Sequence, residues 1–294
     1  MLDIGEVITA MVTPFDKDYR LDIDSCHKLM QYLVDEGNDG ILLSGSTGES
    51  STLDDKEKIS LFKLAKDNFG DKVKIIAGTG SNDTRHSIEL SKEAEKIGVD
   101  CLLIVAPYYN KPSQWGLFKH FEAIAGEVSV PIILYNVPSR TSSNISSKTC
   151  VELSKINNIC GIKEASGNLR QISEIIRDTD NDFLVYSGND GDTLPMLSVG
   201  GYGVISVASH IVCSEIKEMI SSFKKGDFKR AAGMHARLLD IFYGIFIVSN
   251  PVPIKEALNL KGITAGPCRL PLCNMEEKEL SVFKKILKRH KIID

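Results

Sequence analysis

Short apolar runs, recurring at intervals of about 25 to 35 residues, constrain the fold of this chain more than any other feature. Each run is followed by a segment with the amphipathic period of a helix, a pattern that predicts repeated βα units and a parallel sheet. About eight runs can be read from the sequence. They span residues 7–12, 40–44, 73–77, 101–106, 132–135, 159–162, 183–186 and 204–207.

The runs are apolar throughout and do not alternate, which is typical of strands covered on both faces. About eight such strands suit a closed barrel better than an open doubly wound sheet. We therefore expect an α/β fold, a (β/α)8 TIM barrel over residues 1–224. Beyond about Cys213 the pattern is helical only, broken by prolines and glycines. Residues 225–294, too short to fold alone, are expected to form a C-terminal helical appendage on the barrel.

Composition narrows the classes of function. The net charge is −4, and the Lys and Arg residues are scattered along the chain, so nucleic acid is not an expected partner. No stretch approaches about 18 apolar residues and the first residues lack a basic leader, so neither membrane insertion nor export is expected. The odd number of cysteines, 7, suggests reduced thiols and a cytoplasmic location.

Polar residues follow five of the apolar runs, at the strand ends where a barrel of this kind carries its active site. Because the carboxyl ends of all the strands meet at one mouth, these residues are expected to converge there. The segments are Gly45-Ser46-Thr47-Gly48-Glu49, Pro107-Tyr108-Tyr109-Asn110, Tyr135-Asn136, Lys163-Glu164 and Ser187-Gly188.

Lys163 ends an apolar strand, so its amine is expected at the rim of the barrel interior. Desolvation would lower its pKa and leave a neutral amine able to attack a ketone. A lone strand-end lysine more often extends its ammonium into solvent. Here Tyr135 on the neighbouring strand, with Ser46 and Thr47 on a Gly-flanked turn, offers the hydroxyls that imine chemistry needs. The turn also offers backbone N–H groups for a carboxylate, and the combination favours a Schiff-base site.

Arg140 lies in the expected loop after the fifth run, where it could hold a substrate carboxylate or remain a surface charge. No metal is expected, because the six His are dispersed and Cys268 with Cys273 lacks a second pair at zinc spacing. The chain has neither a Walker loop nor a Gly-x-Gly-x-x-Gly run. No cofactor is therefore expected.

Five motifs in order resemble those of the dihydrodipicolinate synthase family, one of the pyruvate-dependent class I aldolases, over essentially the whole chain. They are Gly45-Ser-Thr-Gly-Glu49, Pro107-Tyr-Tyr-Asn-Lys-Pro112, Tyr135-Asn-Val-Pro-Ser-Arg-Thr141, Gly161-Ile-Lys-Glu-Ala-Ser-Gly167 and Asn250-Pro-Val-Pro-Ile-Lys-Glu-Ala-Leu-Asn259. The resemblance implies condensation of pyruvate with L-aspartate 4-semialdehyde to 4-hydroxy-tetrahydrodipicolinate, a step of diaminopimelate and lysine biosynthesis.

By this resemblance Lys163 forms the Schiff base, Tyr135 relays protons and Thr47 holds the pyruvate carboxylate. Ser46 links Tyr135 to Tyr109, which in the family reaches into the adjacent subunit. A tight homodimer, paired into a tetramer, is therefore implied.

The resemblance also assigns the rest of the pocket. It implies that Arg140 binds the carboxylate of the semialdehyde and that the backbone at Gly188 and Ile205 completes the pocket. Ser46 stands where many relatives have Thr, a change that keeps the hydroxyl.

Two positions depart from lysine-inhibited relatives, which have a His and a Glu where this chain has Lys58 and His86. The lost carboxylate predicts weak or absent inhibition by lysine.

Other functions share part of this pattern. An N-acetylneuraminate lyase-like or 2-keto-3-deoxysugar aldolase would share Lys163, Tyr135 and the 45–49 turn, although Arg140 and the pair Tyr108-Tyr109 favour the synthase. A non-catalytic keto-acid-binding barrel would not need the hydroxyls. A phosphate-binding isomerase barrel would need a Gly-rich anion loop where Ser187-Gly-Asn-Asp190 carries an acid.

Overall fold

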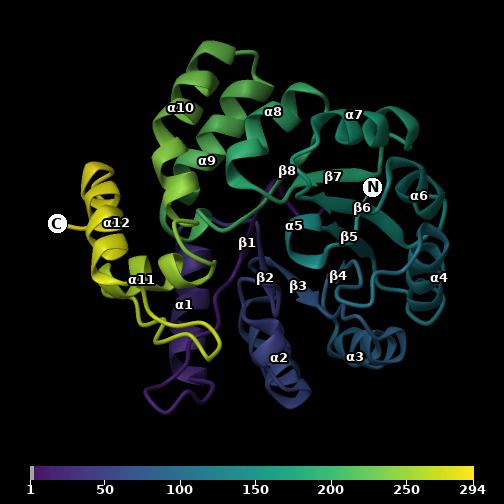
Figure 1. Cartoon of the computed structure of the whole chain (residues 1–294), viewed down its shortest axis with the longest axis horizontal. Helices are drawn as coiled ribbons and strands as arrows, with labels where there is room; N and C mark the ends of the chain where they lie inside the picture. Colours follow the sequence, from purple (N-terminus) through teal and green to yellow (C-terminus); the bar gives the residue numbers. More distant parts are fainter. Residues whose placement is uncertain (1–2) are drawn as a thin grey trace.

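The computed structural model describes residues 3–294 and contains a closed barrel of eight parallel strands in sequence order, in which β1 also pairs with β8 (Figure 1). Each predicted run overlaps one strand, so the TIM barrel is confirmed and the open sheet is excluded. The strands are β1 (Val7–Ala10), β2 (Gly40–Leu43), β3 (Lys74–Gly78), β4 (Cys101–Val105), β5 (Ile132–Asn136), β6 (Ile159–Glu164), β7 (Leu184–Ser187) and β8 (Gly203–Ser206).

Helices connect the strands and form the outer layer of the barrel (Figure 1). A capping box begins α2, where the side chains of Asp54 and Glu57 each accept from the other's backbone N–H. The elements are α1 (Ile23–Asp35), η1 (Ser50–Thr52), α2 (Asp55–Phe69), α3 (Thr84–Ile97), α4 (Gln114–Ala125), α5 (Pro138–Thr141), α6 (Ser147–Leu153), α7 (Leu169–Asp178), η2 (Asp190–Asp192), α8 (Thr193–Ser198) and α9 (Ser209–Lys224).

The core has two parts, because side chains along each strand point alternately into the barrel and toward the helices. Ile133, Tyr135 and Ile205 belong to the cluster that fills the barrel interior. Leu134 and Ile162 belong to the larger cluster between the sheet and the helices. The strand alternation therefore decides which side chains can reach a site inside the barrel.

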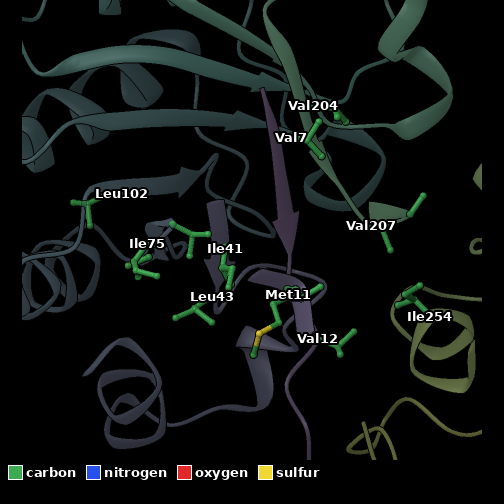
Figure 2. Packing of buried hydrophobic residues seen from close by; sticks show 14 of the residues in the cluster. Val7, Met11, Val12, Ile41, Leu43, Ile75, Leu102, Val204, Val207 and Ile254 are labelled. Carbon is green, nitrogen blue, oxygen red and sulfur yellow. The ribbon is translucent and has the colours of Figure 1, made fainter. Parts of the chain in front are cut away.

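Three helices follow the barrel, α10 (Phe228–Gly244), α11 (Val252–Leu260) and α12 (Glu277–Arg289), and lie along one side of it (Figure 1). Ile254 of α11 lies near Val12 and Val207, so the appendage shares the outer core of the barrel (Figure 2). Helix α9 ends at Lys224, and the division after this residue stays a prediction. Within residues 3–294, no helix combines the length and the apolar character needed to cross a membrane.

Candidate active site

Lys163 and Tyr135 lie side by side in the barrel interior. Strands β5 and β6 pair so that Tyr135 is opposite Lys163, and Nζ of the lysine is 4.5 Å from the centre of the tyrosine ring. Lys163 is only 5% exposed. Within residues 3–294, Nζ has no hydrogen bond and no ion pair. The lysine amine is thus buried against an aromatic ring and left free.

The surroundings of the two side chains shift both pKa values. Burial lowers the pKa of Lys163 to about 8, an effect that the Asp190 carboxylate opposes and the Arg140 charge strengthens. Burial also raises the pKa of Tyr135, while Arg140 and the Ser46 hydroxyl partly oppose the change. Near neutral pH a minority of Lys163, far larger than for an ordinary lysine, is therefore a neutral nucleophile, and Tyr135 keeps a proton that it can donate.

Polar contacts outside the barrel tie the ends of β5 and β6 together. Asn136 and Glu164, which follow Tyr135 and Lys163, point outward, and Nδ2 of Asn136 donates to Oε2 of Glu164 at 3.0 Å. The same carboxylate accepts from Nε2 of Gln171 at 3.0 Å and from the backbone N–H of Ser166 at 2.7 Å. These contacts hold the two strands in the register that places Tyr135 beside Lys163.

The turn after β2 has the shape of an anion site. Ser44 and Glu49 have left-handed backbones, with φ of 54° and 55°, so the chain bends sharply at both ends of the turn. Within residues 3–294, the backbone N–H groups of Ser46 and Thr47 have no hydrogen-bond partner. Two adjacent free N–H groups beside the Thr47 hydroxyl can bind a carboxylate.

Two residues of the appendage contact this turn. Nδ2 of Asn250 donates to Oγ1 of Thr47 at 2.9 Å. Lys255 forms a buried ion pair with Glu49, with 2.7 Å between Nζ and Oε1. The backbone carbonyl of Asn250 also accepts from Nη2 of Arg140 at 3.4 Å. Helix α11 and the residues before it therefore form part of the site.

A cavity of about 610 Å³ opens at this end of the barrel, with Ser46, Tyr108, Arg140 and Asn250 in its wall. Arg140 lies in the one-turn helix α5, so the predicted loop at this position is wrong. Pro138 is compatible with the first turn of a helix, and the backbone N–H of Ser142 donates to the carbonyl of Pro138 at the end of that turn. Lys163 is not part of the cavity wall and lies deeper in the barrel.

A sequence model of the dihydrodipicolinate synthetase family matches residues 3–290. The chain belongs to this family. A protein of Moorella thermoacetica named 4-hydroxy-tetrahydrodipicolinate synthase is 53% identical over 277 residues, 94% of this chain and 95% of that one.

Two crystal structures of family members superpose closely on the chain. The dihydrodipicolinate synthase of Cyanidioschyzon merolae with lysine bound is 42% identical, with a TM-score of 0.97 and 99% of each chain covered. The chloride-inhibited enzyme of Acinetobacter baumannii complexed with pyruvate is 37% identical, with a TM-score of 0.96 over 99% of this chain and 100% of that one.

Gly188 and Ile205, two further residues assigned by resemblance to the dihydrodipicolinate synthetase family, both belong to the barrel strands or their ends, and Gly188 lies against Lys163. A Cβ atom at Gly188 would be 3.2 Å from Cε of Lys163 and 2.7 Å from Cβ of Ala165, so a side chain there would crowd the lysine. Ile205 is buried in the interior cluster. Their roles in substrate binding stay predictions.

Tyr109 does not join the other hydroxyls in a single chain of this family member. Its side chain is 89% exposed, and its backbone is left-handed with φ of 71°. An exposed tyrosine held in this strained conformation suits a contact with another molecule. The predicted link from Ser46 to Tyr109 is not formed within one chain and stays a prediction.

Lys58 and His86, the two departures from lysine-inhibited members of the family, share one carboxylate. Asp55 accepts from Nε2 of His86 at 2.9 Å and pairs with Nζ of Lys58 at 3.4 Å. The carboxylate near these positions is thus already engaged by both side chains. Elsewhere in residues 3–294, no group of three or more His, Cys, Asp or Glu residues is placed to hold a metal ion.

Sequence reasoning did not single out Asn250 or the Lys255–Glu49 pair. Both belong to motifs that it quoted, but nothing in the pattern shows that α11 returns to the β2 turn about 200 residues earlier. A lysine between apolar residues, as in Pro-Ile-Lys255, was the available signal.

Proposed function

We propose that this chain is a 4-hydroxy-tetrahydrodipicolinate synthase, which condenses pyruvate with L-aspartate 4-semialdehyde. The observation that carries the proposal is the buried Lys163 amine, which forms no ion pair within residues 3–294 and lies in contact with Tyr135. Membership of the dihydrodipicolinate synthetase family and the name of the relative from Moorella thermoacetica support this choice of reaction over other aldolases.

Schiff-base formation comes first. The N–H groups of Ser46 and Thr47, together with the Thr47 hydroxyl, bind the pyruvate carboxylate and bring its ketone to Lys163. The neutral Nζ attacks the carbonyl carbon, and the carbinolamine oxygen leaves as water after it accepts a proton from Tyr135. Loss of a methyl proton then converts the imine to an enamine.

Carbon–carbon bond formation follows. The enamine carbon attacks the aldehyde carbon of the semialdehyde, whose carboxylate Arg140 holds with two parallel hydrogen bonds. The substrate amine then attacks the imine carbon, closes the ring and releases Lys163 unchanged. One water leaves for each pair of substrates, and no external cofactor takes part.

The complete relay requires a homodimer. Ser46 passes protons between Tyr135 and the partner subunit's Tyr109, and two dimers pair into a tetramer. The exposure of Tyr109 in one chain supports this assembly.

The experiment is a turnover assay with pyruvate and each of three aldehydes: L-aspartate 4-semialdehyde, N-acetylmannosamine and glyceraldehyde. We expect rapid consumption of the semialdehyde only. Preference for either sugar would instead establish another aldolase, and binding of pyruvate without any turnover would indicate a keto-acid-binding barrel.

A further inference from the structure

We infer that Asn250 is a positioning residue that directs the hydroxyl proton of Thr47 toward the substrate carboxylate. The inference rests on the proposed function, since it assumes that Thr47 meets the carboxylate of pyruvate. It assigns the appendage a direct part in substrate recognition.

The contact is buried and specific. Nδ2 of Asn250 donates to Oγ1 of Thr47 at 2.9 Å, and each residue is only 4% exposed. Water therefore does not compete for this bond, and a buried amide–hydroxyl bond fixes the orientation of both groups.

The direction of the bond determines what the hydroxyl can do next. A threonine hydroxyl has one O–H to donate and two lone pairs with which to accept. Because Asn250 occupies a lone pair, the Thr47 O–H remains available to another acceptor. The free N–H groups of Ser46 and Thr47 belong to the same turn, so the O–H adds a third donor for one anion.

The carbonyl oxygen of the Asn250 carboxamide supports a role for this side chain other than stabilising the fold. Oδ1 of Asn250 is buried and has no hydrogen-bond partner within residues 3–294. Leaving a buried acceptor unpaired is destabilising, and an apolar side chain of similar shape would avoid that penalty. The position therefore retains a destabilising amide whose only side-chain hydrogen bond in the described chain is to Thr47.

The residues around Asn250 fix its geometry. Lys255, one turn further along, is anchored to Glu49 at 2.7 Å and to the carbonyl of Pro267 at 2.7 Å. Glu49 is two residues after Thr47, so Lys255 of α11 and Asn250, which precedes α11, both contact the same turn. Asn250 consequently cannot shift relative to Thr47 without breaking a buried ion pair.

A double-mutant cycle tests the coupling. We expect Asn250→Ala to raise the KM for pyruvate about 10-fold, the effect of one well-placed hydrogen bond, with kcat changed less than about 3-fold. Thr47→Val should raise this KM by at least as much. In the Thr47→Val background, Asn250→Ala should add less than about 2-fold, because the group that it orients is gone.

A binding readout separates positioning from folding. The pyruvate concentration that gives half-maximal borohydride trapping on Lys163 should shift in parallel with KM. Asn250→Asp keeps the shape but can only accept, so it should draw the Thr47 proton away and weaken trapping more than Asn250→Ala. Asn259→Asp is the matched control, since Asn259 contacts Ala265 and Gly266 in the same appendage. It should leave half-maximal trapping unchanged.

The possible results distinguish the positioning role of Asn250 from the proposed synthase function. Independent, additive effects of Asn250→Ala and Thr47→Val on pyruvate binding would overturn this inference while leaving the synthase assignment intact. So would a loss of thermal stability in Asn250→Ala with unchanged half-maximal trapping. Failure of the unmodified protein to trap pyruvate would overturn the proposed function and this inference with it.

Discussion

Two buried lysines in this chain show how one side chain can serve either chemistry or structure. Lys163 in β6 is 5% exposed and Lys255 in α11 is 2% exposed. Both lie near aromatic rings, 4.5 Å from Tyr135 and 4.3 Å from Phe15. In both cases burial lowers the pKa, because the charged form is poorly solvated.

Their partners differ. Nζ of Lys255 is 2.7 Å from a carboxylate oxygen of Glu49, which opposes the fall in the pKa of the lysine. Lys163 has no ion pair within residues 3–294, and the lowering of its pKa by burial outweighs the opposing effect of the Asp190 carboxylate. A buried amine without a counter-charge is poor for stability and well suited to nucleophilic attack, whereas a buried ion pair joins two segments.

The largest loss of turnover is expected from Lys163→Met. Turnover should fall by at least about 10³-fold, because no other amine in the interior can form the imine. Stability should not fall, since the change removes a poorly solvated group. Activity assays and thermal melts check both points, and a variant with near-normal turnover would remove Lys163 from the mechanism.

Tyr135→Phe should lower kcat by about 10²-fold or more, the usual contribution of a positioned acid–base group. The ring that packs on Lys163 remains, so the imine should still form, but slowly. Rapid-quench measurements of trapping provide the test. An unchanged rate of imine formation would show that another group carries the protons.

Lys255→Met tests the structural role of the other buried lysine. It should lower the free energy of unfolding by about 3–5 kcal/mol, because Glu49 is left buried and unpaired. Replacing Glu49 by Leu in the same protein should recover part of the loss. Denaturant titrations measure both, and the surviving folded protein should still form an adduct on Lys163. Loss of that adduct from fully folded protein would show that Lys255 takes part in the chemistry.

The pH dependence of kcat/KM is expected to be a smaller effect, and the lowered pKa of Lys163 determines its direction. The pKa of Lys163 is lowered to about 8, so below this pH the amine is mostly protonated and inactive. We expect kcat/KM for pyruvate to rise about 10-fold per pH unit well below the pKa and to level off above it. A profile that is flat between pH 6 and 9 would contradict the assigned pKa shift.

The smallest effect concerns lysine. Lys58 and His86 both contact Asp55, so a lysine ammonium near them would meet the Lys58 ammonium and a carboxylate that is already engaged. Submillimolar lysine is expected to change turnover little. The double variant K58H/H86E, which restores the pair of lysine-inhibited relatives, should be more sensitive. Strong inhibition of the unmodified protein would show that Asp55 accepts the ligand instead.

The local sequence pattern predicted most of the fold, because each strand lies in an apolar run that can be recognised without knowing which strands pair with it. It also placed Lys163 and Tyr135 correctly, since both end such runs and parallel strands end at one mouth. Asn250 and Lys255 could not be found in this way. Their partners are about 200 residues away and were brought close only by packing of α11 on the barrel.

The comparison of the two lysines can be tested in one measurement, mapping by mass spectrometry of protein incubated with pyruvate and reduced with borohydride. The account predicts one adduct per chain, on Lys163, with Lys255 unmodified. An adduct on Lys255, or none on Lys163, would contradict it.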